Sequence, residues 1–369
     1  MNTANRITLL NSMAALVASA AWAQNSSLDA VGPADSPNRF GLNYRMGFNA
    51  SVKFKNLGGY TLPASRFTPS GAPYNYDDGY VYLDPNGAAN SAWPYTWYWG
   101  YDANPNQYTL GDATLLMHRS SAAADASTGN KDDDPMPGFE VTYNRELYRD
   151  AHVRLGPEFG FGYSSMSVKD SSTLHSDVTV ASDAYGIPVD AATGYGVNYF
   201  PLQNFSGAYT HGYDSVPGSN PLIYRGAISM PSQTIPGGAT VTGTRKFDAD
   251  LFGFRVGPYF EFPISEKVTA GLSGGFALVY VNSKFSYNET VSITGLPTVT
   301  TSNSAWHDDW LPGGYVAGNI SVALSDKWAL TAGAQFEDVG KYKQVLDGKK
   351  ATLDLSQAIF VTLGVTYSF

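Results

Sequence analysis

The chain has 369 residues, a formal net charge of −9 and no cysteine. A disulfide scaffold, a thiolate metal site and a cysteine nucleophile are therefore excluded, and the negative charge argues against binding to nucleic acid. Charged residues make up 15% of the chain and aromatic residues 14%, a balance unlike that of disordered chains or average soluble domains. No internal stretch has the ~18 apolar residues that a membrane-spanning helix needs.

Residues 1–23 have the pattern of a secretory signal peptide. Arg6 precedes an apolar stretch over residues 7–21, and Ala21-Trp22-Ala23 supplies a small-x-small cleavage pattern. We expect this segment to be removed on export and residues 24–39 to form a periplasmic segment. A short amphipathic helix or membrane anchor is the alternative.

Period-two alternation, which is typical of a strand with two different faces, dominates both ends of the remaining chain. From Phe40 to Phe54, apolar residues occupy every even position and polar or small residues every odd one. In the last strand, one face carries the apolar residues Leu353, Leu355, Ile359, Val361, Leu363, Val365, Tyr367 and Phe369.

Six more alternating segments lie between these two, at 139–147, 153–163, 252–262, 268–280, 310–324 and 328–336. Short connections (149–151, 263–267 and 325–327) alternate with long ones (55–137, 169–246, 288–308 and 338–350). This sidedness is typical of a transmembrane β-barrel, and in lipid such a sheet must close on itself. The sequence therefore predicts an all-β, closed antiparallel barrel of eight strands over residues 40–369, with external loops at 55–137 and 169–246. A soluble β-sandwich would need more charge on its outer face.

One segment departs from the pattern. Phe247, Ala249 and Leu251 are apolar in the opposite phase to the run that starts at Phe252. This predicts either a bulge near Leu251 or the point at which the strand leaves the membrane.

The strands resemble those of the small outer-membrane barrels of the OmpA/OmpX type. The most specific part is the C-terminal strand, where Val361, Leu363, Val365, Tyr367 and Phe369 share a face and end on an aromatic. The resemblance implies a location in the cell outer membrane. It also implies that these five residues form the signal read by the outer-membrane assembly machinery, with outer-membrane lipid as the other partner. The first two long connections are far larger than those of such barrels.

Charged residues gather on the faces predicted to point inward: Arg45, Lys53, Glu140, Arg154, Glu158, Arg255, Glu261, Glu337 and Asp354. Charges within a membrane are costly unless they are paired or hydrated, and eight strands enclose only enough space for side chains. We expect an interior salt-bridge network. A charged ion pathway is the alternative.

The first long connection carries an aromatic run in which Tyr95, Trp97, Trp99 and Tyr101 alternate with other residues. This run could form a hairpin above the membrane, or it could add two strands to give a ten-stranded barrel. Its aromatics could bind a glycan or a partner protein, or they could simply pack the loop onto the barrel rim.

No pattern of catalytic or metal-binding residues stands out. Gly271-Leu-Ser-Gly-Gly275 matches G-x-S-x-G but lies within a predicted strand, not at a strand-to-helix turn. The acidic runs 132–134 and 307–309 could bind a divalent cation but are more typical of solvated loops. We therefore expect no enzyme and no cofactor or metal. The favoured function is a structural or surface-interaction barrel with its specificity in the loops. A narrow channel is the alternative, and a lipid-modifying enzyme is less favoured.

Overall fold

The computed structural model describes residues 37–61, 74–81, 95–96, 99–101, 107–109, 114–187, 209–210 and 223–369. Every regular element in these ranges is a β-strand. None of the described residues belongs to a helix of the length and apolarity needed to span a membrane. The predicted signal peptide, and the segment after it as far as residue 36, lie outside the described residues.

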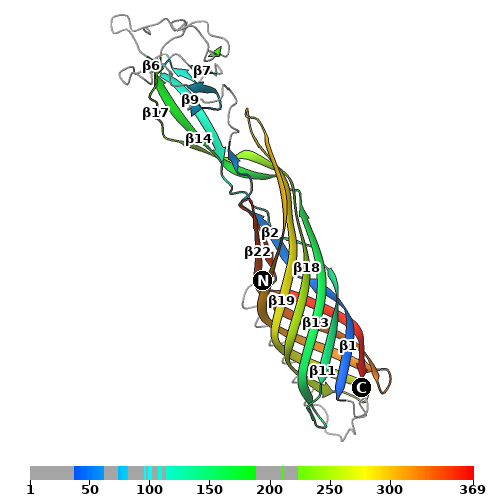
Figure 1. Ribbon diagram of the computed structural model, residues 1–369. Helices are drawn as coiled ribbons and strands as arrows, with labels where there is room; N and C mark the ends of the chain where they lie inside the picture. The colour runs from blue at the N-terminus through cyan, green and yellow to red at the C-terminus, as the bar shows by residue number, and fades with distance from the viewer. Residues whose placement is uncertain are drawn as a thin grey trace, which may run out of the picture.

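Eight antiparallel strands pair around a closed ring in the order β13-β11-β1-β24-β21-β20-β19-β18, and β18 pairs again with β13. No strand of the ring is left with an open edge, which satisfies the backbone in lipid. The predicted eight-stranded antiparallel barrel is confirmed (Figure 1). The strands are β1 (Asn38–Phe48), β11 (Met136–Arg145), β13 (Arg154–Asp170), β18 (Gln233–Pro263), β19 (Val268–Ile293), β20 (Val299–Ala323), β21 (Trp328–Asp338) and β24 (Ala358–Ser368).

The tight connections lie together at one end of the ring. They join β18 to β19 through residues 264–267 and β20 to β21 through residues 324–327, and the short strand β12 (Tyr148–Arg149) turns back onto β13. The backbone amide of Phe369 donates to the carbonyl of Asn38 at 3.0 Å, so the last and first strands also meet at this end. The predicted sidedness is therefore present.

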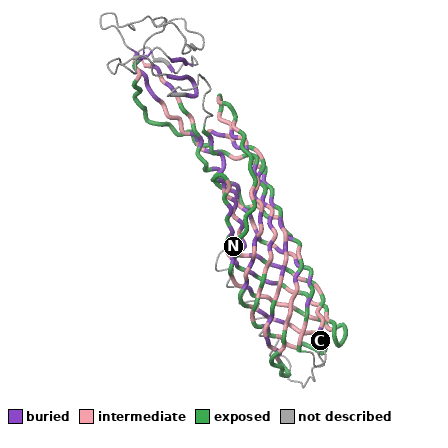
Figure 2. Tube along the Cα trace, in the orientation of Figure 1, coloured by how far each residue is buried: buried purple, intermediate pink, exposed green. Residues whose placement is uncertain are grey.

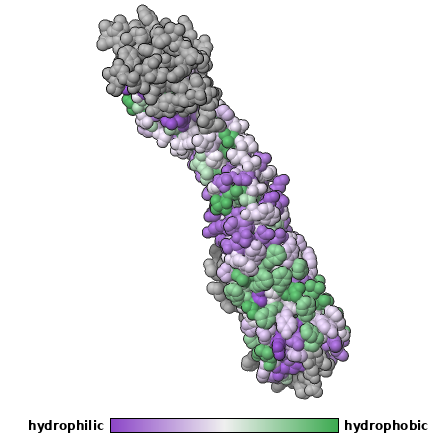
Figure 3. Space-filling model, in the orientation of Figure 1, coloured by the Kyte–Doolittle hydropathy of each residue, from purple (hydrophilic) through white to green (hydrophobic). Residues whose placement is uncertain are grey.

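An apolar band surrounds the ring, and aromatic rings border it at both ends. Figure 3 shows this band as a green zone low on the molecule. At the upper border, neighbouring rings make contact from strand to strand: Phe139–Tyr163, Tyr163–Phe252, Phe252–Tyr280 and Tyr280–Trp310, with centroids 4.9–6.1 Å apart. Trp328, Tyr367 and Phe369 form a matching group at the lower border. Flanking aromatic girdles are typical of barrels that cross a membrane.

Above the upper girdle, β13, β18 and β19 continue as one wall of a segment that we call the stalk (Figure 1). A four-stranded sheet forms another wall, in the order β10 (Lys131–Asp132), β2 (Ser51–Lys55), β23 (Lys349–Asp354) and β22 (Lys341–Leu346). Between the walls lies an apolar core, drawn purple in Figure 2, whose buried members include Val52, Phe54, Phe247, Val281, Phe285, Tyr342 and Leu353.

The apolar faces of the long strands are therefore inverted between the barrel and the stalk. In β18, Phe254 faces lipid, whereas Phe247, Ala249 and Leu251 are buried in the stalk core. The pairing of β18 with β13 and β19 runs unbroken from Leu251 to Phe252. The bulge predicted near Leu251 is therefore wrong. The strand leaves the lipid at this point. Its outward face is apolar in the membrane and its inward face is apolar in the stalk, while the backbone continues regularly.

Short strands beyond the stalk form a segment that we call the head. The main sheet continues into it as β14 (Leu174–Gly186), β9 (Thr114–Ala122), β3 (Tyr60–Thr61), β8 (Tyr108–Thr109) and β17 (Ile228–Ser229). A second sheet has the order β15 (Tyr209–Thr210), β7 (Trp99–Tyr101), β5 (Gly79–Val81) and β4 (Tyr74–Asn75), and β6 (Tyr95–Thr96) pairs with β16 (Ile223–Tyr224).

These pairings decide two points left open by the sequence. The aromatic run contributes β6 and β7 to sheets of the head, so the ten-stranded alternative is wrong. Much of the two segments predicted as loops, 55–137 and 169–246, is extended strand of the stalk and head.

Candidate functional site

Five of the nine charged residues predicted to point inward meet inside the barrel. Arg255 Nη2 lies 2.9 Å from Glu140 Oε1 and 3.7 Å from Glu158 Oε1. Arg45 reaches Glu337 at 3.3 Å and Glu140 at 4.0 Å. Glu140 thus lies between two guanidinium groups. Four of the five residues are buried and the Arg255 side chain is 9% exposed, in keeping with the cost of unpaired charges within a membrane.

The surrounding residues fill the remaining space. The Arg45 guanidinium lies 3.4 Å from the ring centroid of Phe360. A Cβ at Gly160 or Gly162 would overlap Arg255 or Arg45, so these glycines make room for the two arginines. A cavity of about 10 Å³ remains beside Arg45, which is about the space of one water molecule. The interior geometry matches a salt-bridge network in a filled barrel.

Two further predicted residues lie nearer the short turns. Arg154 is the cross-strand neighbour of Glu261, and both side chains face inward. Glu261 forms an ion pair with Arg39, whose Nη2 donates to the hydroxyl of Tyr259 at 2.9 Å. Arg39 was missed by the sequence reading, because it precedes the first recognised alternating residue.

Lys53 and Asp354 do not join the interior network, and their assignment to it is wrong. Both lie on the outward face of the stalk sheet, where Asp354 pairs with Lys341 at 2.7 Å. For Lys53 the cause is a slip at Asn49, which leaves the strand with a φ of 63°, and for Asp354 it is a matching slip at residues 356–357. From Ala50 onward the even positions face the core, so the uninterrupted alternation of the sequence conceals a change of face.

The interior above the barrel is closed by apolar side chains. Met136, Leu251 and Leu355 line the upper end, and all are buried in the stalk core. The charged interior of the barrel is therefore covered by the apolar core of the stalk and does not open to solvent at this end. The arrangement of described residues favours a plugged barrel over the channel alternative.

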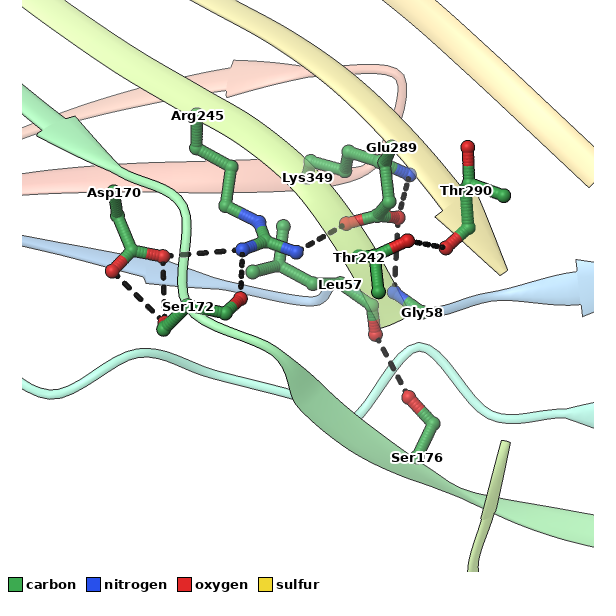
Figure 4. Close-up of polar contacts among 10 residues, drawn as sticks. All are labelled: Leu57, Gly58, Asp170, Ser172, Ser176, Thr242, Arg245, Glu289, Thr290 and Lys349. Atoms are coloured by element: carbon green, nitrogen blue, oxygen red, sulfur yellow. Dashed lines mark hydrogen bonds and ion pairs between the residues drawn. The ribbon is translucent and has the colours of Figure 1, made fainter. Parts of the chain in front are cut away.

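A second buried charge cluster lies in the stalk, where the chain turns toward the head (Figure 4). Arg245 and Glu289 are fully buried. Arg245 lies 3.1 Å from Asp170 and 3.5 Å from Glu289, whose other oxygen pairs with Lys349 at 3.1 Å. Glu289 also accepts the backbone amide of Gly58 at 3.1 Å, and Gly58 has a φ of 83°.

Asp170 holds several partners at once. Its carboxylate accepts the hydroxyl of Ser172 and pairs with Lys131 at 3.1 Å as well as with Arg245. Burial alone would raise the pKa of Asp170, but the hydrogen bonds from Ser172, Lys131 and Arg245 outweigh it and lower that pKa. The cluster ties β13, β18, β19 and β23 together and is a structural clamp.

The head contains a polar cluster that remains partly accessible. The Tyr76 hydroxyl donates to Asp183 at 2.8 Å, and Arg119 pairs with the same carboxylate at 2.9 Å. The Arg119 side chain is 53% exposed and its guanidinium lies 5.2 Å from the Tyr76 ring centroid. Arg119 is therefore the exposed member of this cluster, whereas Asp183 is buried.

His118 and Asp78 form a close pair in the same part of the head. His118 Nδ1 lies 2.5 Å from Asp78 Oδ2, and the backbone amide of His118 donates to Asp78 Oδ1 at 2.9 Å. The hydrogen bond to Asp78 raises the pKa of His118 above its ordinary value, against the opposing effect of burial. No sequence pattern indicated this pair, since 40 residues separate its members.

The predicted aromatic surface is only partly described. Trp99 and Tyr101 are 1% and 7% exposed, so they do not form a ligand surface. They pack in the core of the head with Tyr76, Leu115, Met117 and Tyr185. Tyr95 contributes backbone pairing to β6, and Trp97 lies outside the described residues. The packing alternative holds for Trp99 and Tyr101, within the head rather than on the barrel rim.

The acidic runs mostly cap backbone groups. Asp133 accepts the amide of Ser167 at 2.7 Å, and Asp134 accepts the amide of Asn49 at 2.9 Å. Among the residues described, no group of three or more His, Asp or Glu side chains is placed to hold a metal ion.

The face predicted for the C-terminal strand points outward. Val361, Leu363, Val365 and Phe369 are exposed on the barrel surface, and Tyr367 packs between Trp328 and Phe369. Leu353 and Leu355, assigned to the same face, are instead buried in the stalk core.

No family model and no curated protein matches the chain. Solved structures with similarity include Ail, the attachment invasion locus protein of Yersinia pestis, in complex with the heparin analogue sucrose octasulfate (10% identity, 90% of this chain, 97% of that chain, TM-score 0.25). The outer membrane protease OmpT from Escherichia coli is another (11% identity, 94% and 99% covered, TM-score 0.30). A Pseudomonas aeruginosa FadL homologue scores 0.18 at 9% identity, with 92% and 93% covered. Scores this low carry no information on function, and the identification of the chain as an outer-membrane-type β-barrel rests on its own strand pairing and apolar band.

Proposed function

We propose that this protein is an outer-membrane anchor that holds a β-rich head away from the cell surface, where the head binds a glycan or a protein. The observation that carries the proposal is the inversion of apolar faces above the membrane. A strand set that only lined a pore would need a wet interior, whereas the stalk has a buried apolar core. Burial of such a core is what makes a β-structure rigid in water.

The role is one of binding, without an enzymatic step. The partly accessible groups Arg119 and His118 lie in the head, at the far end of the molecule from the short turns (Figure 1). Binding specificity on surface segments carried by a rigid scaffold is the common arrangement. Phe369 and its neighbours on the last strand face outward. This exposure supports the proposal that the outer-membrane assembly machinery recognises them and inserts the barrel.

The register of the strands defines a head-trimmed variant that tests the proposal. Thr61 pairs with Ser121, and Val180 pairs with Gln233. Asn-Gly, which favours two-residue hairpin turns, can therefore replace residues 62–120 and 181–232. Both chains should reach the outer membrane as heat-modifiable barrels. Cells carrying the full chain should bind members of a glycan array or immobilised host-matrix proteins, and trimmed cells should not. Equal binding by both cells would contradict the proposal.

Conductance of the purified full chain in a planar bilayer tests the channel alternative. The filled interior predicts no steady current at moderate voltage. A steady current that Arg45→Ala enlarges would show that solute passes through the barrel, because Arg45 occupies the interior beside the cavity.

A further inference from the structure

The stalk sheet presents five lysines on one outward face. Its register places Lys53 and Lys343 on either side of Thr352, and Lys55 beside Lys350. Lys341 lies in the next row with Asp354. The inward residues of the same strands, such as Val52, Phe54 and Leu353, are fully buried, so the lysines cannot turn toward the core. We call Lys53, Lys55, Lys341, Lys343 and Lys350 the lysine face.

Most of this positive charge is not neutralised within the protein. Lys53, Lys55, Lys343 and Lys350 form no ion pair with any of the described residues. Three other lysines of the stalk are paired: Lys246 with Asp248 at 2.8 Å, Lys349 with Glu289 at 3.1 Å and Lys131 with Asp170 at 3.1 Å. The concentration is local, because the chain as a whole carries a net charge of −9.

The lysine face lies at a defined height. Phe48 and Ile359, paired across β1 and β24, are the last outward apolar residues below it. At ~3.3 Å per residue, Lys53 and Lys55 lie roughly 15–25 Å further along the strand. The face lies above the apolar band, because the stalk sheet continues from the barrel strands beyond Phe48 and Ile359. At this height it meets the headgroups of neighbouring lipids.

The outward surface of β13, β18 and β19 carries charges of both signs. Lys246 lies beside Lys169, Asp248 lies beside Lys284, and Lys246 pairs with Asp248 at 2.8 Å. On the stalk sheet, by contrast, the five lysines outnumber the outward carboxylates of the described residues, Asp132 and Asp354.

We infer that the lysine face binds the phosphorylated saccharide headgroup of lipopolysaccharide in the surrounding outer leaflet. Adjacent strands are ~4.8 Å apart and alternate residues ~7 Å apart along a strand, so pairs of ammonium groups can contact separate phosphates of one headgroup. Charge near an anionic membrane surface contributes cumulatively for each lysine. This inference rests on the proposed outer-membrane location but not on any ligand of the head.

The test uses the full chain in nanodiscs and four lysine-to-glutamine substitutions, K53Q, K55Q, K343Q and K350Q. The matched control replaces four lysines elsewhere, K169Q, K246Q, K267Q and K284Q. Binding of purified lipopolysaccharide is measured by native mass spectrometry at two salt concentrations. We expect the lysine-face variant to lose at least about tenfold in affinity and the control to change less than about twofold. Lipopolysaccharide stripped of phosphate should bind the native chain as weakly as the phosphorylated form binds the variant.

Two outcomes would overturn the inference: equal binding by both variants, or binding that does not depend on phosphate. The head-trimmed variant separates this inference from the proposed function, since it should bind lipopolysaccharide as the full chain does while losing the ligand of the head.

Discussion

The side-chain amide of Asn49 donates to the backbone carbonyl of Gln357 at 2.8 Å, and these two residues mark the level at which adjoining strands exchange their faces. Below them, Arg45 and Phe360 point into the barrel; above them, Val52 and Leu353 point into the stalk core. In each of the two segments, one residue falls out of the alternation at this level. This hydrogen bond links the two irregular positions. Because both segments shift by one residue here, the apolar residues keep the same alternation in the sequence but face lipid below this level and the stalk core above it.

Outward positions should respond to charge according to their height. Leu363 is 54% exposed within the apolar band, whereas Thr352 faces outward on the stalk sheet. Leu363→Arg should cost about 2–4 kcal/mol of folding free energy near the middle of the band. Thr352→Arg should change it by less than ~0.5 kcal/mol. Urea titration of barrels refolded in lipid measures both changes in folding free energy. Similar losses for the two variants would show that the membrane border does not lie between these positions.

Truncation of the stalk core should be costly although it lies outside the membrane. Phe54 is fully buried and stacks with Phe285, their ring centroids 5.6 Å apart. Phe54→Ala should destabilise the stalk by about 3–5 kcal/mol, whereas Lys53→Ala on the outward face should be nearly neutral. Protease cleavage of the stalk in intact vesicles reports the difference. Unchanged protection in Phe54→Ala would contradict a packed stalk.

Removal of the buried Arg245 should leave each of two carboxylates, Asp170 and Glu289, with only a lysine as its charged partner. Arg245→Gln should destabilise the protein by about 3–5 kcal/mol, because breaking a buried ion pair costs more than replacing it. The double variant Arg245→Gln with Glu289→Gln should lose less than the sum of the single losses. Chemical unfolding of all three variants measures the coupling. Additive losses would show that the two groups do not interact.

The same cluster predicts sensitivity to strong acid. The pKa of Asp170 is lowered in the folded protein, so its stabilising effect is present above the unfolded value and is lost as pH falls through the folded one. The stalk should therefore weaken below about pH 4. The Asp170→Asn variant should be less stable near pH 7, and its stability should depend less steeply on pH in acid. Proteolysis of the stalk measures this stability. An equally steep transition in Asp170→Asn would assign the acid effect elsewhere.

The head should respond to pH in the opposite direction. The pKa of His118 is raised by its hydrogen bond to Asp78, so its stabilising effect is complete below the unfolded pKa of ~6.5 and is lost as pH rises through the folded one. Proteolysis of the head should be slower at pH 5.5 than at pH 8.5. His118→Gln should remove this difference, while His152→Gln, in the turn before β13, should retain it.

Deletion of Phe369 should reduce assembly of the barrel. Phe369 is exposed and stacks on Tyr367, with their ring centroids 6.1 Å apart. The expectation comes from the resemblance to small outer-membrane barrels. Heat-modifiable gel migration of cell-derived protein measures the folded fraction, and Phe369→Tyr serves as the control. An unchanged fraction after deletion would show that the terminal aromatic is not read as a signal.

The barrel could be predicted from the sequence because lipid imposes one rule on every strand that crosses it. Strands such as β21 show this well: Trp328, Leu330 and Phe336 face lipid as their alternation predicts. The stalk could not be predicted, because the same strands obey the opposite rule there. In β18 the sequence shows the change of phase at Leu251, but near Asn49 a slip of the backbone hides it.

The charged interior of the barrel followed from alternation, whereas the clusters of the stalk and the head did not. Glu140 and Arg255 could be placed inside because their strands alternate regularly through the membrane. The Arg245 cluster and the His118–Asp78 pair depend on segments far apart in the chain, whose approach no local pattern encodes. The lysine face was equally hidden, since Lys53 and Lys343 become neighbours only through β23.

The unbroken ladder between β18 and β19 has a mechanical consequence. From Ala239 to Val256 these strands stay in register as they pass from the stalk into the barrel. A pull on the head along the length of the molecule loads this ladder in shear, so its hydrogen bonds share the force instead of opening one after another. Tension from an attached ligand would therefore reach the membrane anchor through the backbone, and the head should give way before the stalk does.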